Sequence, residues 1–183
     1  AMSVDRTNRF RFVDGLAIPN ALNTLEAAAK IASDLISNKK FFMEAMCDVL
    51  NDVARLGVDG LTGPTKEEAE KIYTSIRCTI SFFGKPDSYM QCASGRGKIF
   101  IGETWIDALM NLWKVPFELP STEEVSRHKV LFVIKLLHEA QHEATAQFLR
   151  LPRVISTLEK QARSVGTAVC KKRKARAVES VER

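Results

Sequence analysis

The chain has 183 residues, of which 45% are hydrophobic and 27% charged, which is typical of one globular domain and excludes a largely disordered chain. Segment 171–176 carries five positive charges, as many as the whole net charge of +5, which excludes a basic face spread over the body. No apolar run approaches the roughly 20 residues of a membrane span, and no signal core is visible. We therefore expect a cytoplasmic protein, or a nuclear one if the basic segment acts as a localisation signal.

Apolar residues recur at helical spacing along most of the chain, after an irregular N-terminal arm over residues 1–19. The predicted helices span residues 21–37, 40–56, 66–82, 105–114, 121–149 and 153–164. N-cap signals precede four of them, at Asn20, Thr65, Thr104 and Ser121. Glu68 and Glu124 complete capping boxes with Thr65 and Ser121. The four cysteines form no CxxC pair, which argues against a thiolate zinc site and a dense disulfide framework.

The helical pattern is interrupted once, between residues 89 and 102. Two short runs are separated there by Ser-Gly-Arg-Gly, and the second run, over 98–102, favours a strand. This pattern predicts a β-hairpin, or at least one edge strand. The expected fold is therefore mostly α with a small β element (α+β). We expect a single domain over 20–166, where Gly166 ends the last helix, and a basic tail over 167–183.

The long helix over 121–149 contains the sequence His-Glu-Ala-Gln-His, which begins at His138 and ends at His142. Residues four apart on a helix are offset by only about 40°, so both imidazoles can converge on one tetrahedral ion. Glu139 is turned by about 100° from His138 and can reach a water bound to that ion. The line from Ile134 through both histidines is interpreted as an inward-facing stripe. Buried imidazoles need partners, which a metal or nearby carboxylates would supply.

This five-residue motif resembles the zincins, the HExxH zinc metallopeptidases. The resemblance covers about residues 97–160. It implies a Zn²⁺-dependent hydrolase of peptide or protein substrates, in which Glu139 takes a proton from the metal-bound water. It also implies that an edge strand before the motif helix, here 98–102, orients the substrate backbone. The sequence departs from the family at Ala140, where a bulky apolar residue is usual, and at Glu143, where a charge is usually avoided.

A catalytic zinc site needs a third protein ligand, and the resemblance to the glutamate-using zincins implies a carboxylate. His128 lies about 15 Å along the helix from the motif and is too far away to share the ion. If the chain turns at 150–152 into an antiparallel helix, Glu159 faces the motif, and it is slightly favoured. Glu179 is the alternative, and it requires the basic tail to fold back over the site.

Oxyanion stabilisation is a weaker assignment. The zincin resemblance implies a Tyr or His donor, for which Tyr73, Tyr89 and His128 are candidates, although packing in the core or at its edge is strongly favoured over this role for each of them. The competing hypothesis is a helical interaction module without chemistry, which binds acidic partners or nucleic acid through 171–176. Nucleic acid is the less favoured partner, because no aromatic residues are interleaved with the basic ones. A zinc-binding scaffold without catalysis lies between these two hypotheses.

Overall fold

The computed structural model describes residues 8–13, 19–57, 59–82, 90–93, 96–114 and 120–179. Its helices are α1 (Pro19–Ser37), α2 (Lys39–Gly57), α3 (Lys66–Ser75), α4 (Glu103–Lys114), α5 (Thr122–Leu149) and α6 (Pro152–Glu179). Its strands are β1 (Phe10–Phe12), β2 (Cys78–Ser81), β3 (Met90–Ala93) and β4 (Lys98–Ile101). The predicted α+β class, mostly helical, is confirmed. None of the helices searched within the described residues is long and apolar enough to cross a membrane.

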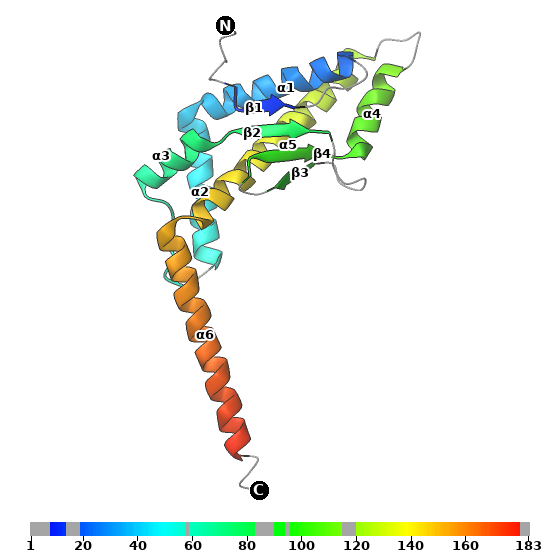
Figure 1. The fold of residues 1–183 in the computed structure, drawn as a ribbon. Coiled ribbons are helices and arrows are strands. Elements are labelled where there is room, and N and C mark those ends of the chain that lie inside the picture. Colours follow the sequence, from blue (N-terminus) through cyan, green and yellow to red (C-terminus); the bar gives the residue numbers. More distant parts are fainter. Residues whose placement is uncertain are drawn as a thin grey trace.

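The strands form one mixed sheet in the order β1-β2-β4-β3. Strands β1, β2 and β4 run parallel, and β3 pairs antiparallel with β4, so the predicted hairpin is confirmed. Helix α5 crosses one face of the sheet, with α1 alongside it (Figure 1). The expectation that strand 98–102 is an edge is wrong, because β4 has β2 on one side and β3 on the other. The edges are β1 and β3.

Two of the strands lie where the sequence predicted other structure. The helix expected over 66–82 ends at Ser75, and β2 follows directly. Thr79 and Ile80 are β-branched, and burial alternates along β2, so pairing inside the sheet stabilises an extended backbone here. The arm over 1–19 contains β1, whose Phe10 is 1% exposed.

Helix starts follow the local capping chemistry only in part. Both predicted capping boxes are present, at Thr65 and at Ser121. Asn20 and Thr104 are not caps, because α1 begins at Pro19 and α4 at Glu103. Proline at the first helical position suits α1, since its missing N–H would have no partner inside the helix there.

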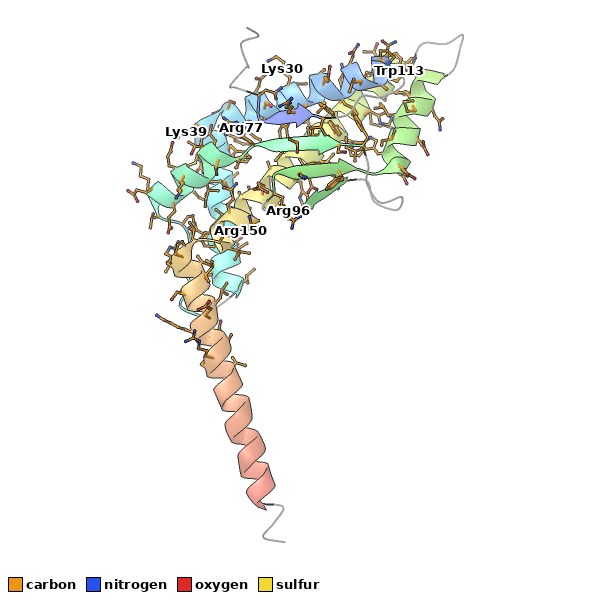
Figure 2. The ribbon with its side chains drawn as sticks, viewed as in Figure 1. Lys30, Lys39, Arg77, Arg96, Trp113 and Arg150 are labelled. Atoms are coloured by element: carbon orange, nitrogen blue, oxygen red, sulfur yellow. The ribbon has the colours of Figure 1, made fainter. Side chains whose placement is uncertain are left out.

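Helix α6 differs most from expectation. The predicted antiparallel return helix ending at Gly166 is wrong: α6 runs through Gly166 to Glu179 and leaves the body of the molecule (Figure 1). Arg150 lies at the bend between α5 and α6 (Figure 2). The expected boundary between domain and tail, at 166–167, falls inside this helix. Among the described side chains of α6, Val154 is buried and Leu158 packs against the core, whereas Ile155 and Val165 are 42% and 56% exposed.

Polar contacts made by Arg153 fix the start of α6. Its guanidinium donates two hydrogen bonds of 2.6 Å to the carboxylate of Glu68 at the start of α3. It also donates to the carbonyl oxygens of Thr62 (3.1 Å) and Gly63 (2.8 Å) in the preceding loop. The hydrogen bonds from Arg153 hold the pKa of Glu68 below its usual range. The direction of α6 is therefore set by the α2–α3 loop, not by packing along α5.

The contribution of this ion pair can be isolated with Glu68→Gln, because glutamine at this position keeps the capping box. We expect the free energy of unfolding at pH 7 to fall by about 1 kcal/mol. Because the pKa of Glu68 is lower in the folded state, the ion pair contributes its full stabilisation above the unfolded pKa of about 4.3. This stabilisation is lost as the pH falls through the folded-state pKa. Urea denaturation at pH 7 and pH 3 measures this change in the free energy of unfolding. The exposed neighbour Glu67→Gln is the control. An equal loss at both pH values would contradict the assignment.

Candidate metal centre

The His-Glu-Ala-Gln-His motif lies on α5, which is buried along one side only. The buried residues of α5 are Phe132, Val133, Leu136, Glu139, Ala140, Glu143, Ala144 and Phe148. Ile134 is 55% exposed, and both histidines are exposed. The expectation that Ile134 and the histidines form an inward stripe is therefore wrong. The helix is rotated so that its two motif-region glutamates face the interior and its imidazoles face solvent.

The two imidazoles point their Nε2 atoms at each other. The Nε2–Nε2 distance between His138 and His142 is 2.9 Å, and the ring planes are almost perpendicular at 89°. Two Zn–N bonds of about 2.05 Å at a tetrahedral angle would separate the nitrogens by about 3.3 Å, so a small outward motion admits an ion. Without an ion, one ring donates its Nε2–H to the other ring's bare Nε2. This ring arrangement is compatible with a shared ion and with a direct hydrogen bond between the rings.

Glu139 completes a group of three potential ligands. One ligand atom each from His138, Glu139 and His142 lies within 4.8 Å of the other two. Glu139 is only 5% exposed, and no described residue donates a hydrogen bond to its carboxylate. Burial raises the pKa of Glu139, an effect that the nearby His142, His138 and Lys135 oppose. The carboxylate oxygens of Glu139 are not among the described buried atoms that lack a partner, so they keep some contact with solvent and can reach a cation or a metal-bound water at the histidines.

Glu143, the residue that departs from the zincin pattern, has a different environment. It is 4% exposed, and its Oε2 accepts a hydrogen bond of 3.2 Å from the backbone N–H of Gly97 in the β3–β4 turn. Its Oε1 accepts one of 3.0 Å from Gln147 Nε2. The two glutamates on the buried side of α5 therefore differ. Glu143 is hydrogen-bonded to the β3–β4 turn, and Glu139 is not. Sequence reasoning missed this role of Glu143, although an acidic residue one position after the motif was a visible signal.

The structure does not bring the expected third ligand to the histidines. Glu159 is exposed on α6, pairs at 3.6 Å with Arg163, and is not part of the ligand group, so its assignment needs correction. The antiparallel helix pair that would have placed it there does not form. Glu179 is the last residue of α6, whose far end lies away from α5 (Figure 1), and its side chain is outside the described part of the chain. His128 lies on α5, half-buried, with its Nδ1 buried and without a partner.

Of the two tyrosine candidates, the structure describes only Tyr73, which does not supply an oxyanion donor. Tyr73 is buried, donates its hydroxyl hydrogen to the carbonyl oxygen of Ile36 at 3.1 Å, and stacks under the guanidinium of Arg9. It is a core residue and not a site residue. Tyr89 lies outside the described residues. Of the predicted site residues, the structure groups His138, Glu139 and His142.

Comparisons with known proteins add no assignment: no protein-family model, no curated protein and no solved structure matches this chain. The zincin resemblance therefore depends on the five-residue motif and on the geometry of its three polar side chains.

The cost of burying Glu139 can be measured in the metal-free protein. A raised folded-state pKa means that the protonated form favours folding, so the charged carboxylate destabilises the protein above the unfolded pKa of about 4.3. In EDTA at pH 7, we expect Glu139→Gln to raise the melting temperature by about 2–4 °C, with no gain at pH 4. Thermal melts followed by circular dichroism measure this, with exposed Glu44→Gln on α2 as control. A lower melting temperature at pH 7 would contradict it.

Proposed function

We propose that this chain is a zinc-dependent peptidase in which His138 and His142 bind the ion through Nε2 and Glu139 is the general base. The observation that carries the proposal is the convergence of two imidazole nitrogens beside a buried carboxylate that accepts no hydrogen bond from the described residues. Two nitrogen donors favour zinc over magnesium or calcium, which prefer all-oxygen sites.

The chemistry follows from the positions of these groups. A bound zinc ion supplies a water whose pKa is lowered to about 7. Glu139, partly desolvated and beside His138 and His142 on α5, would accept the proton of that water on its carboxylate oxygen. The hydroxide left behind would add to the carbonyl carbon of the peptide, the C–N bond would break, and Glu139 would transfer its proton to the leaving amine. Burial raises the pKa of Glu139, which makes this carboxylate a stronger base than an exposed one.

The substrate backbone is proposed to pair with β3, not with residues 98–102 as the sequence suggested. Strand β3 is the sheet edge that contacts α5, and its outer side has no partner strand among the described residues. An extended peptide can add to such an edge through main-chain hydrogen bonds. Glu139 is also close enough to be the third ligand itself, and the variants below separate that role from the role of base.

The test begins with metal content. Elemental analysis should find about one zinc per chain, lost in His138→Ala. Glu139→Gln should keep the zinc and lower hydrolysis of fluorescently labelled casein by at least about 100-fold, because only the base is removed. Loss of zinc in Glu139→Gln would instead make Glu139 a ligand. Glu159→Gln, on the exposed part of α6, should change neither. Absence of bound zinc, or full hydrolysis by Glu139→Gln, would refute the peptidase assignment.

A second candidate function is binding of an acidic protein through α6. The observation in its favour is that α6 is continuous through 171–176 and leaves the body, so the basic segment stands apart from the domain (Figure 1). Long-range attraction to an acidic surface would be strong there and screened by salt.

This alternative predicts that the whole chain binds a polyglutamate peptide and loses at least about tenfold in affinity between 50 and 200 mM salt. Deleting 171–176 should abolish binding, and EDTA should not affect it. Fluorescence anisotropy measures this, with duplex DNA as the competing probe. Unchanged affinity after the deletion would exclude α6 as the binding element.

A further inference from the structure

The β3–β4 hairpin is attached to the motif helix by one buried side chain. Glu143 directly follows His142, and its Oε2 accepts the N–H of Gly97 at 3.2 Å. Gly97 lies in the tight turn that joins the two strands, next to Arg96, which Figure 2 shows at that turn. The connection therefore runs between a residue beside a proposed metal ligand and the loop that determines where β3 lies.

The other side of the same turn is also held tightly. Gly97 has a φ of +58°, and a Cβ at this position would lie 2.5 Å from the carbonyl oxygen of Arg77, so only glycine fits. The carbonyl oxygen of Gly97 accepts hydrogen bonds from the backbone N–H of Thr79 at 2.7 Å and from its hydroxyl at 3.2 Å. The turn is thus fixed between β2 and α5, and Glu143 supplies the α5 side.

Glu143 is itself oriented by its neighbours. Gln147, one helical turn later, donates to Oε1 of Glu143 at 3.0 Å, so both carboxylate oxygens accept hydrogen bonds from the protein. The side-chain oxygen of Gln147 is in hydrogen-bond contact with the hydroxyl of Ser75 at the end of α3. A carboxylate is suited to this position because each of its oxygens is an acceptor, whereas an amide has only one.

We propose that Glu143 is a positioning residue, which fixes the β3–β4 hairpin, and with it the open edge of β3, against the turn of α5 that carries His142. The expected effect of Glu143 on substrate binding rests on the proposed peptidase function. The hydrogen bond by which Glu143 holds the hairpin against α5 does not depend on that function. Glu143 faces the interior and is outside the ligand group, so it contributes no metal ligand. Its effect should appear in substrate binding and in hairpin order, not in metal affinity.

The first test is Glu143→Gln, which keeps the volume of the side chain but turns an N–H₂ group toward one of the two donors. In hydrogen-exchange mass spectrometry of the metal-free protein, we expect residues 90–101 to exchange about tenfold faster, as for loss of a hydrogen bond to a charged group. The rest of the protein should stay within about twofold of wild type. The same substitution at Glu123, exposed in the first turn of α5, is the matched control.

The second test separates positioning from general support of the fold. Calorimetric titration with zinc should give a Kd within about threefold of wild type, because both imidazoles are retained. With labelled casein, KM should rise about tenfold while kcat stays within about twofold, the signature of lost uniform binding. Gly97→Ala, which disturbs the same turn from the β2 side, should reproduce both the hairpin exchange and the KM effect.

The outcomes distinguish this inference from the proposed function. If wild type neither binds zinc nor cleaves casein, the peptidase proposal fails, and selective hairpin exchange alone still decides the role of Glu143. If exchange at 90–101 is unchanged, or rises equally throughout the protein, Glu143 is not a positioning residue. A fall in kcat with unchanged KM would also overturn the inference, because the effect would then lie in the chemical step.

Discussion

The rotation of α5 about its own axis is the constraint on which the site depends. Phe132, Leu136 and Ala144 are each 0% exposed, and together they fix which side of this helix is buried. Once that side is fixed, the 3.6-residue period turns His138 and His142 to solvent and Glu139 to the interior. A rotation that moved each residue into the position of the next one would bury both imidazoles, because positions 139 and 143 are buried. The packing of α5 against the core therefore determines which side chains of the motif face solvent and which face the interior.

The sequence was sufficient for those features that depend on nearby residues. The helical periodicity, the capping boxes at Thr65 and Ser121 and the antiparallel hairpin are all local, and all three were predicted correctly. Strands β1 and β2 were missed because each has only three or four residues and pairs in parallel with a distant segment. A short parallel strand has no turn signal of its own, since its stability comes from neighbours far away in the chain.

The site shows the same division between local and distant determinants. An i,i+4 histidine pair on a helix follows from local geometry, and the observed ring convergence agrees with it. Which way the pair faces depends on the whole core, and the apolar character of Ile134 predicted that direction wrongly. The position of Glu159 depended on the direction of α6, which Arg153 sets through Glu68, 85 residues earlier in the chain. No spacing within 121–164 contains that information.

The two buried glutamates of α5 illustrate how burial alone fails to assign a role. Glu139 and Glu143 are similarly buried, at 5% and 4% exposure, and both would cost stability as isolated charges. Glu143 recovers that cost through hydrogen bonds from Gly97 and Gln147. Glu139 has no such donor among the described residues, and its carboxylate oxygens keep some contact with solvent. The difference in their hydrogen bonding therefore gives one carboxylate a structural role and leaves the other available for a proton or a metal.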